Sequence, residues 1–193
     1  GQNTKLELMK YIEVFDQNGL KVMKISEQEA PKNTDFEVKI AVYAAGVNRA
    51  DVLQRLGNYP PPEGISSILG LEVAGEIVAI GCQVQGFKKG DRVMALLPGG
   101  GYAQFVVVDY RLLMPIPKHL DYIQAAGIPE VFLTAYQTLF NLARLRPKEQ
   151  VLIHAGASGV GTAAIQLANI WGAQVSVTVG SDEKARFCQK LGA

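Results

Sequence analysis

A glycine-rich turn between an apolar strand and an amphipathic helix is the feature that most restricts how this chain can fold. The strand is predicted at residues 151–155, with the sequence VLIHA, and the sequence GASGVG follows it directly. Residues 162–173 then carry apolar side chains at helical spacing, residues 174–180 predict a second strand, and Ser181 caps a further helix. The order strand, helix, strand, helix predicts the first half of a doubly wound parallel sheet, the Rossmann arrangement.

The turn itself is a predicted binding site for the phosphates of a dinucleotide, formed by Gly156, Ser158, Gly159, Val160 and Gly161. Small residues permit a tight turn, a close approach of backbone to pyrophosphate, and close packing of helix on strand. The N-terminus of the following helix then presents free N–H groups to the phosphates. The alternative is a tight strand-to-helix turn that binds no ligand.

The tip of the second strand indicates which nicotinamide cofactor binds. NAD sites usually place Asp or Glu at this tip, about 20 residues after the turn, to bind the ribose 2′-hydroxyl. Here the tip holds Gly180 and Ser181, and Lys184 follows on the next helix. A small tip leaves space for a 2′-phosphate, to which Ser181 donates a hydrogen bond and Lys184 supplies charge. We therefore expect NADPH, although Asp182 and Glu183 also fit a solvated helix start.

Residues 1–130 are typical of a β-rich domain. Segments 38–44, 73–80 and 92–97 read as strands, and glycines and prolines separate them. Many short strands with this punctuation predict a small barrel or sandwich. Residues 131–193 then begin the nucleotide-binding domain. Because the sequence stops after two predicted strands of that domain, we expect the chain to be truncated within it.

Composition argues against several classes of protein. The sequence has 19 Lys and Arg against 18 Asp and Glu, a net charge of +1, so no nucleic-acid partner is expected. Two cysteines without a CxxC motif are too few for a disulfide framework or a structural zinc site. No apolar run approaches the roughly 20 residues of a membrane span, and no leader is recognisable. We expect a cytoplasmic protein without a membrane partner.

Longer stretches of the sequence resemble the zinc-free quinone oxidoreductases of the medium-chain dehydrogenase/reductase superfamily, with the p53-inducible group nearest. The matching stretches are NRADVLQRLGNYPPPEG, ILGLEVAG, GDRVMALLPGGGYAQ, LLMPIPKHL, IPEVFLTAYQTL and VLIHAGASGVGTAAIQLA. The resemblance implies a GroES-like catalytic domain followed by a Rossmann domain. Zinc-dependent relatives have Gly-His-Glu where this chain has Gly70-Leu71-Glu72, so no metal is expected.

The resemblance also implies site residues in the first domain. Asn48, Arg49, Asp51 and Tyr59 match residues that line a nicotinamide and quinone pocket, with Asn48 and Tyr59 as the catalytic positions. From the residues alone, Asn48 also fits a turn, Asp51 fits a helix-start charge, and Tyr59 fits loop packing.

A second implied segment follows Pro129, which interrupts the pattern before a helix predicted over residues 131–143. In this segment Glu130, Thr134 and Gln137 match residues that approach the nicotinamide and its phosphate. The implied activity is metal-free hydride transfer from NADPH to a quinone, by a homodimer when the protein is full length. The alternatives are reduction of an enoyl or alkenal C=C bond and a non-catalytic, crystallin-like or binding role. His154, at the end of an apolar strand, is expected in the core.

Overall fold

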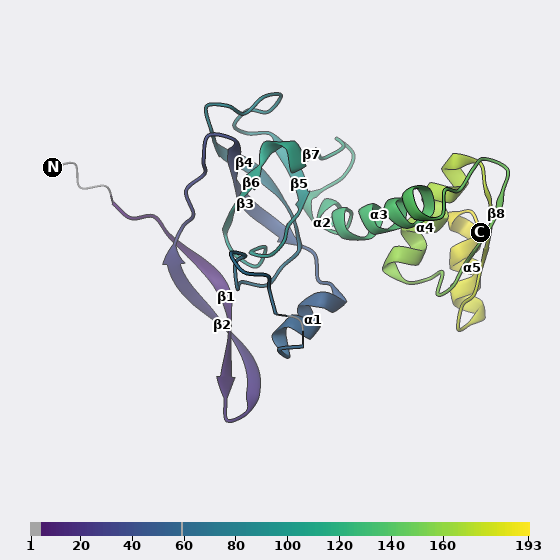
Figure 1. The fold of residues 1–193 in the computed structure, drawn as a ribbon, viewed down its shortest axis with the longest axis horizontal. Helices are drawn as coiled ribbons and strands as arrows, with labels where there is room; N and C mark the ends of the chain where they lie inside the picture. Colours follow the sequence, from purple (N-terminus) through teal and green to yellow (C-terminus); the bar gives the residue numbers. More distant parts are fainter. Residues whose placement is uncertain (1–4, 59) are drawn as a thin grey trace. The chain divides into compact units, whose positions relative to one another are not determined.

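The computed structural model describes residues 5–58 and 60–193, and the chain divides into two compact units, 1–129 and 130–193 (Figure 1). This division falls one residue before the boundary expected from the sequence. The strands are β1 Leu8–Gln17, β2 Leu20–Glu29, β3 Glu37–Ala45, β4 Glu72–Ile80, β5 Arg92–Leu96, β6 Phe105–Asp109, β7 Met114–Pro115, β8 Gln150–Ile153 and β9 Gln174–Val177. The helices are α1 Arg49–Arg55, the 3-10 helix Tyr110–Leu112, α2 Tyr122–Ala126, α3 Pro129–Tyr136, the π-helix Gln137–Leu142, α4 Gly159–Trp171 and α5 Asp182–Leu191.

An antiparallel sheet of five strands, in the order β6-β3-β4-β5-β7, is the centre of the first unit. The strands expected at 38–44, 73–80 and 92–97 are confirmed as β3, β4 and β5. Their apolar side chains meet in one core, in which Ile40 and Ile77 are almost completely buried. The first domain is therefore β-rich, as its sequence predicts.

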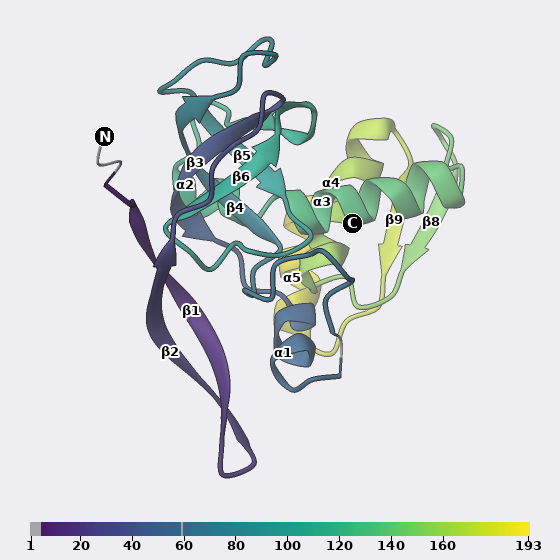
Figure 2. The same cartoon turned by 60° about the vertical axis from the view of Figure 1, so that its left-hand side comes forward.

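Strands β1 and β2 form a long hairpin that extends away from the five-stranded sheet (Figures 1 and 2). Asn18 and Gly19 make its two-residue turn, both with positive φ (55° and 80°), as this class of tight hairpin requires. At its other end the hairpin is joined to the segment before β6, where the Ile12 N–H donates to the Tyr102 carbonyl oxygen at 2.9 Å. The hairpin thereby anchors the main chain of Tyr102.

The second unit contains the predicted strand, helix, strand, helix order. Strands β8 and β9 pair in parallel with Ile153 opposite Val177, so both strands end at the same edge of the sheet. Helix α4 packs Ala163, Ala164 and Ala168 into the core. It begins at Gly159, three residues before the predicted start at 162, because Ser158 caps the helix within the glycine turn.

The helix expected over residues 131–143 is present with two differences. Pro129 does not interrupt it but is its first residue, a position that lacks an N–H partner in any case. From Gln137 onward the helix continues as a π-helix to Leu142. Apolar spacing did not reveal this change of helix type, because a segment of 6 residues is too short to show the wider turn of a π-helix.

Candidate active site

The glycine turn after β8 contains two glycines at positions where a side chain has no room. A Cβ on Gly161 would lie 2.4 Å from the Ala155 carbonyl oxygen, and a Cβ on Gly156 would lie 2.7 Å from the Val177 side chain. Ala155 itself has a positive φ of 52°, which costs energy for a residue with a side chain. The turn is therefore held tightly against both the start of α4 and the end of β9.

The start of α4 has the properties of a phosphate-binding site. Ser158 accepts a hydrogen bond on its Oγ from the Gly161 N–H at 3.0 Å. Gly159 and Val160 are the first two residues of the helix. N–H groups at these positions have no carbonyl partner within the helix. Together with the helix dipole, these groups favour an anion at this end of α4. The five predicted turn residues thus lie together in one turn.

Thr178 connects the ends of the two strands, a role that sequence reasoning missed. Its Oγ1 accepts from the Ala155 N–H at 3.2 Å and lies 3.1 Å from His154 Nδ1, and its carbonyl oxygen accepts from the Gly156 N–H at 3.0 Å. The expectation that His154 lies in the core is wrong, because the residue is exposed and contacts Thr178 at the edge of the sheet.

The predicted 2′-phosphate residues lie at the adjacent strand tip. A Cβ on Gly180 would meet no atom within 4 Å, so this position opens into free space. Ser181 caps α5 by accepting from the Lys184 N–H at 3.3 Å, which leaves its own O–H available as a donor. Lys184 is exposed in the first turn of α5, close to Ser181 in the chain. The tip therefore has open space at Gly180, a hydroxyl donor at Ser181 and an exposed lysine on the helix that follows.

A mostly apolar cavity of about 440 Å³ adjoins the glycine turn within the second unit. Ser158, Val160 and Gly161 border it from the turn, and Thr138 and Leu139 border it from the π-helix. The predicted residues Glu130, Thr134 and Gln137 lie on α3 and at the first position of the π-helix, at spacings of four and three that place them on one helix face.

In the first unit, Asn48 and Asp51 lie at the start of α1 within a cluster of buried polar groups. Asp51 Oδ2 accepts two hydrogen bonds, from the Asn48 backbone N–H and from the Tyr102 hydroxyl, each at 2.8 Å. The Asn48 amide Nδ2 donates to Glu72 Oε1 at 3.1 Å. Both carboxylates are almost fully buried, with 3% of Asp51 and 2% of Glu72 exposed.

Burial is the largest influence on the pKa of the Tyr102 hydroxyl. It raises the pKa of the Tyr102 hydroxyl above its usual range, and the hydrogen bond to Asp51 and the charges of Asp51 and Glu72 raise it further. At physiological pH, Tyr102 is therefore a neutral phenol that donates a hydrogen bond to Asp51, and not a phenolate. Arg49 is the exposed first residue of α1, and Tyr59 lies outside the described residues.

Glu72 and Tyr102 are the members of this cluster that sequence reasoning did not single out. The signal for Glu72 was a carboxylate at the start of a mostly apolar strand, and the signal for Tyr102 was an aromatic residue after three glycines. Both signals are weak by themselves, because surface residues give the same pattern.

Comparison with known proteins agrees with this division of the chain. Residues 34–118 match the family described as alcohol dehydrogenase GroES-like domain, and residues 159–193 match the family described as zinc-binding dehydrogenase. Quinone oxidoreductase of Rattus norvegicus is 37% identical over 192 residues, which are 98% of this chain and 58% of that protein.

Solved structures with the same fold include two kinds of reductase. CurK enoyl reductase superposes with a TM-score of 0.81 at 36% identity, covering 95% of this chain and 57% of that one. The quinone oxidoreductase from Coxiella burnetii superposes with a TM-score of 0.83 at 34% identity, covering 97% of this chain and 61% of that one. This chain thus spans about three fifths of the length of each of these relatives.

These matches define a GroES-like domain followed by the start of a Rossmann domain, the architecture of enzymes that use nicotinamide cofactors. The chain belongs to the medium-chain dehydrogenase/reductase superfamily, and its homologues include quinone oxidoreductases. Within residues 5–58 and 60–193, no three His, Cys, Asp or Glu side chains are grouped so as to hold a metal ion. In the same part of the chain, no helix has the length and apolar character needed to span a membrane.

Proposed function

We propose that the complete protein catalyses the NADPH-dependent reduction of quinones by hydride transfer without a metal. The observation that carries this proposal is the 37% identity to a quinone oxidoreductase across 98% of the chain. Leu71 supports the metal-free reaction, because zinc-dependent relatives have histidine there. A quinone is already electrophilic, so its reduction requires no Lewis acid.

The second unit fits the cofactor. At Gly156 and Gly161 the turn packs so closely on neighbouring protein atoms that a Cβ has no room, and the first N–H groups of α4 favour an anion such as pyrophosphate at this end of the helix. Gly180, Ser181 and Lys184 would receive the 2′-phosphate that distinguishes NADPH from NADH. When bound, the nicotinamide supplies the hydride, and the protein supplies position and a pocket that excludes water.

The first unit would contribute the substrate side of the reaction. In this proposal Asn48 lines the pocket for nicotinamide and quinone, and the bonds to Asp51 and Glu72 hold it in one orientation. Reduction of the quinone to a hydroquinone consumes the hydride from the nicotinamide and one proton, and this proton comes from solvent or from the Tyr59 hydroxyl.

A second candidate is reduction of a C=C bond conjugated to a carbonyl. The 36% identity and TM-score of 0.81 to CurK enoyl reductase favour it specifically. Both reactions transfer a hydride to an electron-poor carbon skeleton, so they differ in the shape of the substrate pocket rather than in the cofactor site.

Steady-state oxidation of NADPH by the complete protein, with 1,2-naphthoquinone against a 2-alkenal, ranks the two candidates by kcat/KM. We expect the quinone to be preferred, and a higher kcat/KM for the alkenal would replace the proposal with the second candidate. If Trp171 fluorescence and thermal shift show no binding of NADPH, both reductase activities are excluded and a non-catalytic role is favoured.

The choice of cofactor has its own test. Lys184→Ala in the complete protein should weaken NADPH about tenfold and NADH little, because one charge-assisted phosphate contact is lost. The matched control is Lys190→Ala, at the far end of the same helix. Equal losses for both cofactors would remove Lys184 from the 2′-phosphate site.

We further propose that the complete protein is a cytoplasmic homodimer that binds no nucleic acid or membrane. The net charge of +1 supports the absence of a nucleic-acid partner. Light scattering at increasing protein concentration tests the dimer, and a monomeric mass throughout would contradict it.

A further inference from the structure

Glu72 and Tyr102 hold the start of α1 through separate hydrogen bonds. Glu72 accepts from the Asn48 amide at 3.1 Å, and Tyr102 donates to the Asp51 carboxylate that also accepts from the Asn48 backbone. The amide and the main chain of Asn48 are therefore both fixed by buried carboxylates. Tyr102 in turn fixes one of these carboxylates.

Glu72 and Tyr102 are both held by contacts outside α1. Glu72 is the first residue of β4, and its carboxylate occupies the space beside Gly46, where a Cβ would lie 2.0 Å from Oε1. The main chain of Tyr102 bonds to Leu69 at 2.8 Å and to Ile12 at 2.9 Å. Asn48 therefore takes its position from a rigid part of the fold.

This arrangement is not the one that stability alone favours. A buried carboxylate costs free energy, and apolar residues of similar volume often stabilise a fold as well or better. Asp51 Oδ1 is buried without a hydrogen-bond partner in the described part of the chain. Asn48 precedes α1 as its N-cap, where Asp51 accepts from its main-chain N–H in a capping box, while its side-chain amide donates to Glu72.

We propose that Glu72 and Tyr102 are positioning residues for hydride transfer, which set the orientation of the Asn48 amide in the substrate pocket. The inference rests on the proposed function, in which Asn48 lines that pocket. Neither residue is required to touch the substrate, because each acts through Asn48 or Asp51.

The kinetic test uses Tyr102→Phe in the complete protein, which removes the hydroxyl and keeps the ring. We expect kcat for 1,2-naphthoquinone to fall about tenfold while KM for NADPH stays within about twofold, since only the reacting geometry is loosened. Tyr110→Phe is the matched control, because it makes the same change elsewhere in the first unit. A kcat unchanged in Tyr102→Phe would overturn the proposal.

A double-mutant cycle with Asn48→Ala separates positioning from general destabilisation. If Tyr102 acts through Asn48, its loss should have little further effect on kcat once the amide is gone. Multiplicative losses in the double variant would show that Tyr102 acts independently of Asn48, and the inference would then be wrong.

An NMR measurement, which does not depend on turnover, distinguishes this inference from the proposed function. The side-chain amide resonance of Asn48, assigned by its loss in Asn48→Ala, should shift in Tyr102→Phe and Glu72→Gln and stay in place in Tyr110→Phe. An unmoved resonance would overturn the inference whatever the activity. A shifted resonance in a protein that reduces neither quinone nor alkenal would confirm that the residues orient Asn48 and reject the proposed reaction.

Discussion

At the scale of single residues, the hydroxyl of Tyr102 reports on the charge of the carboxylates around it. Burial, the bond to Asp51 and the nearby charges all raise its pKa, so it should ionise at a higher pH than an ordinary tyrosine. A raised folded pKa gives stability that is complete below the ordinary value of about 10 and is lost as pH rises through the folded value.

An alkaline titration of tyrosinate absorbance checks this prediction. Tyr102→Phe should remove a component that titrates at unusually high pH, and Asp51→Asn should move that component to lower pH, because it removes a negative charge and keeps an acceptor. A component at this high pH that persists in Tyr102→Phe would assign the raised pKa to another tyrosine.

Gly161 allows a second prediction at this scale. Gly161→Ala places a Cβ 2.4 Å from the Ala155 oxygen and 2.7 Å from the Gly156 oxygen, both in the main chain. We expect a loss of about 1–3 kcal/mol in unfolding free energy, because the turn must move. The control is Gly180→Ala, which meets no atom within 4 Å and should change stability by less than about 0.5 kcal/mol. Chemical denaturation measures both, and equal losses would contradict the packing argument.

Sequence distance explains why some of the candidate site was predictable and some was not. The glycine turn is a local pattern, so its strand and its small residues are readable together, although the cap at Ser158 was not predicted. Tyr102 meets Asp51 across 51 positions, and Asn48 meets Glu72 across 24. Only the register of the sheet and the close approach at Gly46 bring these groups together, and neither is visible in local spacing.

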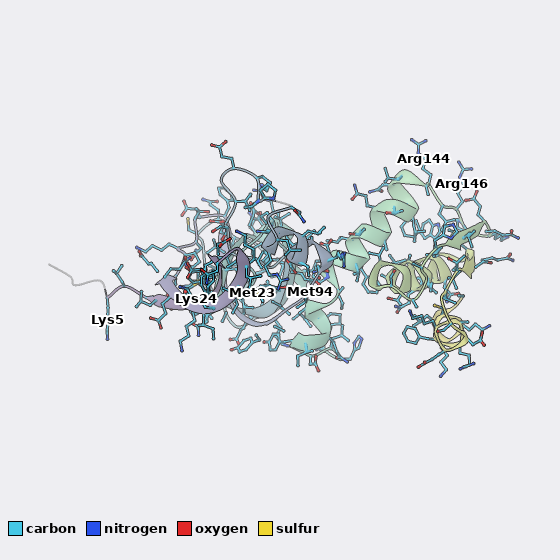
Figure 3. The ribbon with its side chains drawn as sticks, turned by 90° about the horizontal axis from the view of Figure 1, so that it is seen from below. Lys5, Met23, Lys24, Met94, Arg144 and Arg146 are labelled. Atoms are coloured by element: carbon cyan, nitrogen blue, oxygen red, sulfur yellow. The ribbon has the colours of Figure 1, made fainter. Side chains whose placement is uncertain are left out.

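At the scale of elements, the π-helix ends at a strained backbone position that is occupied by arginine and not by glycine. Arg144 follows the helix with a φ of 53°, a left-handed conformation that usually belongs to glycine. Arg146, two residues later, does not have a positive φ. Both arginine side chains point outward from the second unit (Figure 3), so neither supplies core packing.

The two arginines should therefore respond to glycine with opposite signs. Arg144→Gly should stabilise the protein by about 0.5–1 kcal/mol, because it relieves the left-handed strain. Arg146→Gly should destabilise it by about as much, 0.5–1 kcal/mol, because it only adds freedom to the unfolded chain. Thermal unfolding of the two variants side by side measures this, and a shift of the same sign in both would show that φ does not control the effect.

Elements differ in how well their sequences predict them. Strands β3, β4 and β5 are readable as apolar segments between glycines and prolines, and α5 is readable from its cap at Ser181, because each signal lies within or beside the element. The change to a π-helix at Gln137 depends on a hydrogen-bond pattern that leaves no distinct apolar spacing over only 6 residues. The early start of α4 depends on Ser158, whose cap bond overrides the low helix propensity of Gly159 and Gly161.

At the scale of the whole molecule, the arrangement of β8 and β9 limits what residues 1–193 do by themselves. These two parallel strands make up the sheet of the second unit in its described residues, and Leu152 of β8 is 57% exposed. A doubly wound fold binds a dinucleotide in the crevice between strands that run to both sides of the first strand. The glycine turn and the strand tip supply one side of such a crevice.

We therefore expect the 193-residue chain alone to bind NADPH at least about tenfold more weakly than the complete protein, since contacts worth more than about 1.4 kcal/mol would be missing. Calorimetric titration of both proteins with NADPH measures the difference. Gly161→Ala in each protein is the control for binding at the glycine turn, because this turn is present in both proteins. Equal affinity in the two proteins, abolished by Gly161→Ala in both, would show that the turn and the tip at Gly180 form a sufficient site, and that the second side of the crevice adds catalysis rather than affinity.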